Sequence, residues 1–230
     1  VKLVVSNNCA IFADNIFSGY RSENGSTLLI GAIFYMFQIY GDFSGYSNIA
    51  IGVSKLFGIR LMTNFARPFF STNISDFWKK WHISLTSWMM DYVNNPLAFR
   101  LRKYKKAGMA VSIVCTFLLV GFWHGAEWKY LLYGLLHGLY FIPLLLMKNT
   151  KRSSVVARGK LIPGLKETVQ MTGLFFLVCI TGIFFRADTI TDAARYIRDI
   201  FGAGLLSVPE FQYRGIALIT LAFVLLMLIT

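Results

Sequence analysis

Acidic side chains are scarce in this sequence, with 11 aspartates and glutamates against 23 lysines and arginines. The three cysteines, Cys9, Cys115 and Cys179, lie far apart, so their spacing indicates neither a disulfide framework nor a metal site. Gly-rich phosphate loops, nucleophile-elbow serines and internal repeats are also missing. We therefore expect no bound metal, and no bound cofactor of the kinds that these motifs hold.

Apolar side chains are abundant, at 56% of the chain, and the mean hydropathy of +0.56 is too high for a soluble domain of 230 residues. Apolar runs predict membrane-spanning helices over residues 27–59, 107–122, 130–147 and 168–185. The expected fold class is all-α, a polytopic transmembrane helical protein with interfacial amphipathic helices.

The first of these apolar runs is longer than one span requires. We expect it to bend at residues 41–45, where two glycines weaken the helix. Asp42 lies between these glycines and is expected to be a buried, hydrogen-bonded carboxylate that fixes the bend.

The positive charge is concentrated in two segments. Residues 60–106 hold nine basic side chains against two acidic ones, and residues 148–167 hold six against one. Residues 186–214 are balanced, with four arginines against four acidic side chains. Because cytoplasmic loops of membrane proteins carry an excess of lysine and arginine, both basic segments are expected in the cytoplasm and the balanced segment outside. Their position beside membrane spans indicates contact with anionic lipids, and no nucleic-acid partner is expected.

Residues 74–92 carry apolar side chains at steps of three and four residues, which predicts one amphipathic helix that Pro96 closes. Tryptophans on one face and lysines on the other suit the membrane interface. His82 lies at the border of the apolar face and either points into the protein or is a polar edge residue. The expected polar face includes Asp76, Lys79 and Lys80. A second amphipathic helix is expected at residues 190–201, with an apolar face of Ala194, Ile197 and Phe201.

His124 lies between the apolar runs at residues 107–122 and 130–147, which predict a membrane hairpin. An ionisable side chain deep in such a hairpin indicates a functional site, because burying it is costly. The alternative is a histidine at the wet end of the hairpin that bonds to backbone and does no chemistry. An imidazole titrates near neutral pH and can take a proton from a hydroxyl within hydrogen-bond reach. His137, on the returning helix, is interpreted as a packing or polar contact between helices.

Five motifs in order resemble the membrane-bound O-acyltransferase family, most of all its alginate O-acetyltransferase branch, with the D-alanyl-teichoic-acid exporter as a relative. They are YGDFSGYSNIAIG at residues 40–52, NF and RP at 64–68, DFWKKWHISL at 76–85, WHG at 123–125 and FFRA at 184–187. The resemblance covers about residues 1–202. It also implies that residues 1–230 are a single membrane-embedded domain, the C-terminal portion of a longer chain, truncated at both ends.

The resemblance implies transfer of an acyl group from a thioester donor to a hydroxyl, with His124 as the catalytic residue and His82 assisting. Trp81, Trp123, Trp128 and Asp42 are the expected substrate-binding residues. The implied donor is acetyl-CoA, and the implied partners are a cell-surface polysaccharide and an extracytoplasmic acyltransferase protein that completes the transfer. The implied location is the bacterial inner membrane.

A different class of function is compatible with the same residues. In a non-catalytic transporter or scaffold for polymer export, His124 and His82 would line a polar path. The two hypotheses differ in whether loss of His124 abolishes acylation or export.

Overall fold

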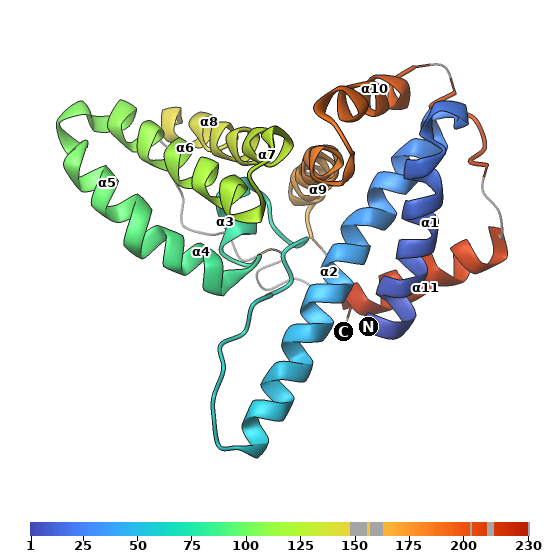
Figure 1. Cartoon of the computed structure of the whole chain (residues 1–230), viewed down its shortest axis with the longest axis horizontal. Helices are drawn as coiled ribbons and strands as arrows, with labels where there is room; N and C mark the ends of the chain where they lie inside the picture. The colour runs from blue at the N-terminus through green and yellow to red at the C-terminus, as the bar shows by residue number, and fades with distance from the viewer. Residues whose placement is uncertain (148–155, 157–162, 203, 211–213, 230) are drawn as a thin grey trace. The chain divides into compact units, whose positions relative to one another are not determined.

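The structure is a computed structural model that describes residues 1–147, 156, 163–202, 204–210 and 214–229. Within these residues the regular elements are helices, and no strand occurs (Figure 1). The chain divides into two compact units, one of Val1–Met62 with Gly182–Thr230 and one of Thr63–Thr181. Four helical segments are long and apolar enough to cross a membrane: Gly25–Leu56, Arg102–His124, Trp128–Leu146 and Leu165–Arg186. The expected all-α polytopic membrane fold is confirmed.

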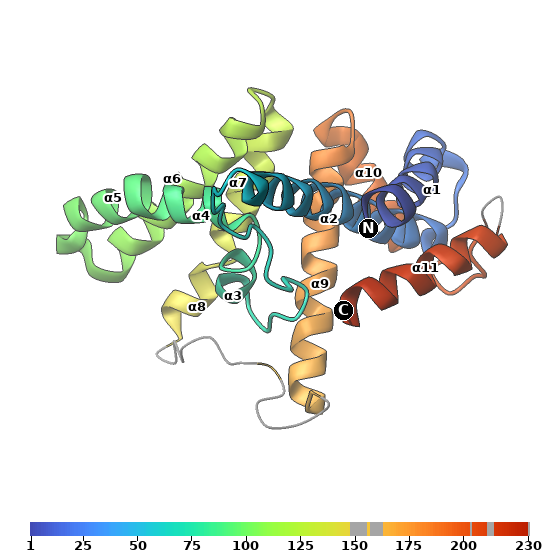
Figure 2. The same ribbon diagram turned by 90° about the horizontal axis from the view of Figure 1, so that it is seen from below.

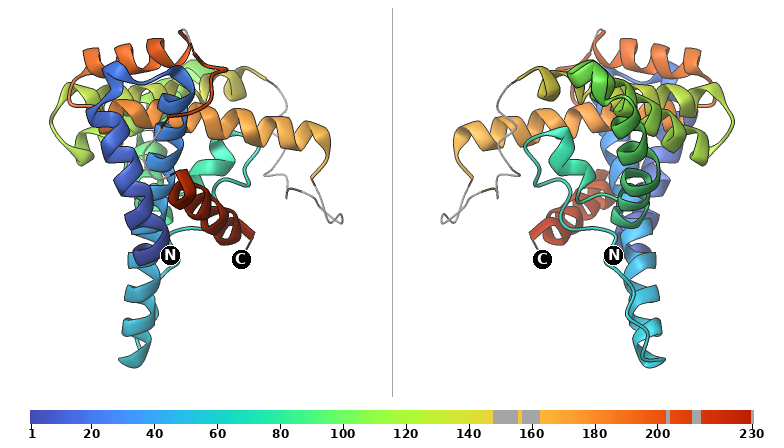
Figure 3. Two further views of the ribbon diagram at one scale, coloured as in Figure 1. Left: turned by 90° about the vertical axis from the view of Figure 1, so that its right-hand side faces the viewer. Right: turned by 90° about the vertical axis from the view of Figure 1, so that its left-hand side faces the viewer.

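The first unit is built on the long helix α2 (Gly25–Leu56), which begins where the Asn24 side chain accepts a hydrogen bond from the Thr27 amide at 2.9 Å. The π-helix η1 (Lys2–Ser6) and helix α1 (Asn7–Ser18) run along α2, and helix α10 (Ile190–Ile200) lies across one end of the pair (Figure 3, left). The unit also contains the short helix η2 (Tyr20–Ser22) and helix α11 (Arg214–Ile229).

The expected bend in this apolar run is wrong, because α2 continues without interruption through residues 41–45. Its glycines allow close packing instead. A Cβ at Gly41 would lie 3.3 Å from the Ser6 Cβ, and one at Gly45 would lie 2.9 Å from the Lys2 Cβ. The expected burial of Asp42 is also wrong, since its half-exposed carboxylate pairs with the Lys2 ammonium at 2.8 Å on the surface.

The amphipathic helix α10 is confirmed, but its buried face is shifted by one residue. Ala193, Tyr196 and Ile200 are buried, in place of the expected Ala194, Ile197 and Phe201. The Tyr196 hydroxyl donates to the Leu28 carbonyl at 2.8 Å, and its ring stacks on Phe17 at 4.5 Å. These contacts with α1 and α2 fix which side of α10 turns inward.

The second unit contains the predicted hairpin. Helix α6 (Lys105–His124) ends at a short turn, and helix α7 (Trp128–Leu139) folds back along it before the short α8 (Ile142–Leu146) (Figure 2). Glycines let the two backbones touch, because a Cβ at Gly121 would overlap the Tyr130 carbonyl and one at Gly134 would overlap the Phe117 carbonyl. Helix α9 (Leu165–Arg186) runs from this unit into the first, with the change between Thr181 and Gly182.

The single amphipathic helix expected at residues 74–92 is wrong. Helix α3 (Ile74–Trp78) and helix α4 (Ile83–Met89) are separate, with the break at His82. Helix α4 continues through the π-helix η3 (Met90–Asn94) into α5 (Asn95–Arg100), and the 3-10 helix η4 (Arg102–Tyr104) precedes α6. Pro96 therefore lies in the first turn of α5, where proline needs no hydrogen-bonded amide, and does not close the helix.

The expected polar face of this segment is also wrong at one position. Asp76 is 1% exposed, and its carboxylate pairs with the Lys80 ammonium at 2.8 Å. Lys80 also donates to the Phe70 carbonyl at 2.7 Å, so it ties the residues that follow α3 to the turn that precedes α3. Burial of this carboxylate is compatible with its charge because a cation one helical turn away compensates it.

Candidate active site

His82 occupies a strained turn between α3 and α4. Its backbone has φ 47° and ψ 55°, a left-handed conformation that residues other than glycine adopt at a cost of about 1–3 kcal/mol. Asn64 holds this turn from outside the helices. Its carbonyl accepts from the Ile83 amide at 3.0 Å, and its side-chain oxygen accepts from the Ser84 amide at 3.1 Å. Two of the sequence motifs are therefore bonded to each other at the position of His82.

Trp81 forms the packed layer beneath His82. Its ring stacks on Phe77 at 5.4 Å and meets Phe65 edge-on at 5.2 Å, and only 9% of the residue is exposed. The Trp81 carbonyl accepts from the Thr86 hydroxyl at 3.1 Å, which ties it to the first turn of α4. Trp81 thus supports the His82 turn, and its expected contact with substrate remains a prediction.

His124 is the last residue of α6, half-buried at the turn of the hairpin and not in the middle of a helix. Trp123 contacts both histidines edge-on, with ring centroids 4.9 Å from His124 and 6.0 Å from His82. Tyr133 on α7 faces His124 from the other arm, at 6.3 Å between ring centroids. The second unit therefore brings together three of the predicted site residues, and an aromatic ring lies against each imidazole.

The protonation of His82 follows from its surroundings. Burial lowers the pKa of His82 below its ordinary value of 6.5, and a hydrogen bond with its own backbone opposes this shift. The Nδ1 atom lies 3.5 Å from the Ser84 hydroxyl, near the limit of a hydrogen bond. His82 is therefore neutral at pH 7, and a neutral imidazole can accept a proton.

Two predicted site residues make none of these contacts. Trp128, an expected substrate-binding residue, opens α7 and is 77% exposed. Asp42 belongs to the other compact unit, where it forms the surface ion pair with Lys2. Neither position tests whether these residues contact substrate.

The sequence did not single out Asn64, Ser84 or Tyr133 as site residues. A signal for Tyr133 exists on α7, where Tyr133, His137 and Tyr140 follow at steps of four and three residues and share one helix face. His137 is fully buried there, and its Nδ1 accepts from the Trp78 indole at 3.3 Å. This bond joins α3 to α7 and confirms the expected polar contact between helices.

The arrangement suits proton transfer by side chains. Two imidazoles share one indole as a neighbour. Across the part of the chain that the structure describes, no three histidine, cysteine or carboxylate side chains gather as a metal site. A base at this turn can take a proton from a hydroxyl that reaches it.

The sequence model of the membrane-bound O-acyltransferase family matches residues 22–185, which include His82 and His124. The peptidoglycan O-acetyltransferase of Helicobacter pylori is 31% identical over 90% of this chain and 38% of its own length. The probable alginate O-acetylase of Pseudomonas putida is 33% identical over 99% of this chain and 45% of its own length. The teichoic acid D-alanyltransferase of Bacillus subtilis is 42% identical over 48% of this chain and 30% of its own length. The chain spans less than half the length of these relatives, and it belongs to the membrane-bound O-acyltransferase family.

Proposed function

We propose that the protein is an O-acyltransferase of the bacterial inner membrane that passes an acyl group, acetyl, from a thioester donor toward hydroxyls of a cell-surface polysaccharide. The observation that carries the proposal is the pairing of His124 and His82 about Trp123, within the segment that matches the family. The names of these relatives each give a polysaccharide or cell-wall polymer, namely peptidoglycan, alginate or teichoic acid, although they differ in the group transferred.

In the proposed reaction, His124 acts as the general base. Its imidazole takes the proton from the acceptor hydroxyl while the hydroxyl oxygen attacks the thioester carbonyl carbon. The carbon–oxygen bond of the ester forms, the carbon–sulfur bond breaks, and the proton passes to the departing thiolate. His82, neutral at pH 7, orients the donor or assists this proton transfer.

The remaining parts of the proposal concern donor, substrate contacts and partner. Cytoplasmic acetyl-CoA is the proposed donor, and the basic residues at 100–106 are compatible with that source. Its acyl group must pass to the other end of α6 to reach His124. Trp81, Trp123, Trp128 and Asp42 are the proposed substrate contacts. An extracytoplasmic acyltransferase protein is the proposed partner that completes the transfer to sugar hydroxyls.

The test compares this proposal with a transporter or scaffold for polymer export. Cells carrying the wild type or His124→Ala at matched protein level are assayed for the amount of exported polymer and for its ester-linked acetate. We expect His124→Ala to lower the acetate content while export continues. Failed export with unchanged acetate per polymer would instead favour the transport function.

A further inference from the structure

The first unit contains a cleft of about 590 Å³ at the end of α9, where the FFRA motif lies. One side comes from the end of α1 and from η2, and the other from the end of α9 and from α10. The residues that line it are Phe17, Ser18, Tyr20, Arg21, Arg186, Ala187, Asp188, Asp192 and Tyr196. This motif has no role in the reaction proposed for His124, so the cleft needs an explanation of its own.

The aromatic base of the cleft is rigid. Tyr196 is 1% exposed, and its hydroxyl is held by the Leu28 carbonyl while its ring stacks on Phe17 at an interplanar angle of 17°. The Arg186 guanidinium lies 5.6 Å from the centre of the Phe17 ring and forms an ion pair with Asp14 at 2.7 Å. The two rings cover each other's faces and are buried, so they form a fixed apolar base beneath the cleft, beside the Arg186 guanidinium.

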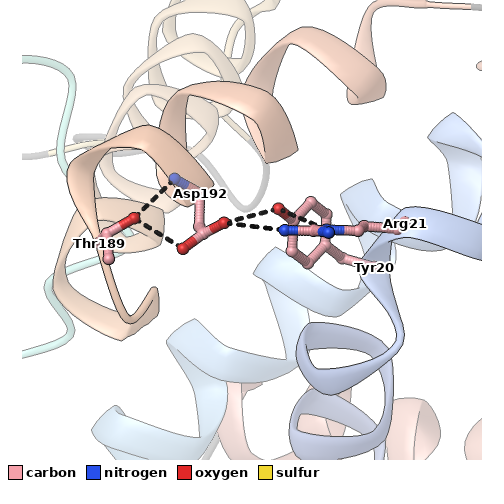
Figure 4. A network of polar contacts seen from close by, with 4 residues as sticks. All are labelled: Tyr20, Arg21, Thr189 and Asp192. Atoms are coloured by element: carbon pink, nitrogen blue, oxygen red, sulfur yellow. Dashed lines mark hydrogen bonds and ion pairs between the residues drawn. The ribbon is translucent and has the colours of Figure 1, made fainter.

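A polar network centred on Asp192 joins α10 to η2 across the cleft (Figure 4). Its carboxylate accepts from the Tyr20 hydroxyl at 2.8 Å and from the Thr189 hydroxyl at 2.6 Å. The Arg21 guanidinium lies 3.7 Å from the same carboxylate and donates to the Tyr20 hydroxyl at 3.4 Å. The bonds from Thr189 and Tyr20 hold the pKa of Asp192 below its ordinary value, so it stays ionised.

The charges that line the cleft cancel, with two arginines against two aspartates. Each arginine already faces a carboxylate, so an anionic ligand gains little from them. Among the described residues Asp188 has no hydrogen-bond or ion-pair partner, and it is exposed at the cleft. A carboxylate in this position accepts hydrogen bonds from hydroxyl groups, and Arg21 is 73% exposed and can donate to them.

We propose that this cleft is a saccharide-binding subsite that takes an uncharged, hydroxyl-rich sugar residue among its polar side chains. Hydroxyl groups of the sugar would donate hydrogen bonds to the Asp188 carboxylate and accept hydrogen bonds from the Arg21 guanidinium. That the sugar belongs to a cell-surface polysaccharide rests on the proposed function. The balanced charge of residues 186–214 agrees with a position outside the cytoplasm, where such a polymer is found.

The test uses the full-length protein as it occurs in its native membrane, purified into lipid nanodiscs. Binding is measured by saturation-transfer NMR and thermophoresis with two probes, an uncharged tetramer of N-acetylglucosamine and an anionic tetramer of mannuronate. We expect the uncharged tetramer to bind more tightly. Asp188→Asn and Arg21→Gln should each weaken its binding about ten-fold, as expected for loss of a hydrogen bond to a charged group.

Arg198→Gln is the matched control. Arg198 is also 73% exposed and paired with an aspartate, Asp199, at 2.7 Å, but it does not line the cleft. Binding by this variant should equal that of the wild type. Absence of binding, tighter binding of mannuronate, or equal losses in Arg21→Gln and Arg198→Gln would overturn the proposal.

Acetyl transfer by the same preparations separates this proposal from the proposed function. If the wild type transfers acetyl but binds neither tetramer, only the saccharide subsite is wrong. If the uncharged tetramer binds and Arg21→Gln weakens it without any acetyl transfer, the subsite stands and the enzymatic proposal fails.

Discussion

At the residue scale, two ion pairs of similar length, both outside the membrane-spanning helices, differ in how well water reaches them. Lys80 and Asp76 are 2.8 Å apart with side-chain exposures of 23% and 1%, whereas Arg198 and Asp199 are 2.7 Å apart with exposures of 73% and 33%. Removing one partner of a buried pair leaves a charge without compensation, and removing one partner of an exposed pair leaves a solvated charge.

We therefore predict that Lys80→Met lowers the free energy of unfolding by about 3 kcal/mol, and Arg198→Met by less than about 1 kcal/mol. Both substitutions remove one cation and keep an unbranched side chain. Thermal unfolding in the same detergent, followed by tryptophan fluorescence, measures the difference. Equal shifts of the two unfolding midpoints would contradict the burial of Asp76.

The second prediction at this scale concerns pH. Because burial lowers the pKa of His82, its neutral form persists as pH falls below 6.5 and is lost only at the lowered value. Acetyl transfer that needs neutral His82 is therefore expected to continue below pH 6.5. Ser84→Asp places a carboxylate beside the Nδ1 atom, which raises this pKa and should move the acid limb of the rate profile to higher pH.

Ser87→Asp is the control for that experiment, since Ser87 lies on the same helix and bonds to the Ser84 carbonyl, not to the imidazole. The rate profile of each variant from pH 5 to 8 gives the comparison. An acid limb shared by both variants would show that protonation of His82 does not limit the reaction.

At the element scale, the close contact of α6 and α7 depends on glycine. A Cβ at Gly134 would overlap the Phe117 carbonyl, whereas one at Gly173, within α9, would meet nothing within 4 Å. Gly134→Ala should separate the hairpin arms and lower the unfolding midpoint. Gly173→Ala should leave it unchanged or raise it slightly, because alanine favours a helix by about 1 kcal/mol. A loss of stability in both variants would point to a general effect of side chains in the spans.

The elements that sequence could predict are those whose cause is local. Hydropathy over twenty residues is sufficient for α6, α7 and α9, and side-chain periodicity for α10. The break at His82 was missed because Asn64, far back in the chain, supplies the hydrogen bonds that hold the left-handed turn. A bend at Gly41 and Gly45 of α2 was predicted wrongly for a similar reason. Only their contact with η1 shows that these glycines serve close packing of two helices and not a bend in one.

In the candidate site, too, some residues could be predicted from local sequence and others depend on contacts between distant parts of the chain. His124, His82 and Trp123 followed from a motif and from the cost of an ionisable group in an apolar hairpin, and the structure brings them together. Tyr133 depends on how α7 folds back on α6, and the saccharide subsite depends on contacts between residues 17–21 and 186–196, so neither could be read from local pattern. The catalytic roles, and the single membrane-embedded domain, stay predictions.

At the scale of the whole molecule, the distribution of charge predicts a topology. Ala126, in the hairpin turn, should face the outside, and Lys166, at the start of α9, should face the cytoplasm. The expectation that all of residues 60–106 lie in the cytoplasm is wrong in this topology, because the His82 ring lies 6.0 Å from the Trp123 ring, beside the turn, and only the basic residues at 100–106 lie at the other end of α6.

Cysteines in place of Ala126 and Lys166 should label from opposite sides with a membrane-impermeant maleimide. The background needs Cys115→Ser, because Cys115 is exposed whereas Cys9 and Cys179 are buried. Labelling of both positions from one side would contradict the hairpin.

The central claim is that His124 is the base of an acyl transfer, and transfer of labelled acetyl from acetyl-CoA to surface polymer in membrane vesicles tests it most directly. Vesicles with wild type, His124→Ala or Cys115→Ala are compared at matched protein level, because Cys115 lies on the same helix away from the site. The account predicts that His124→Ala loses at least about a hundred-fold in rate, the usual contribution of a general base, while Cys115→Ala is unchanged. Equal rates in the wild type and His124→Ala would contradict it.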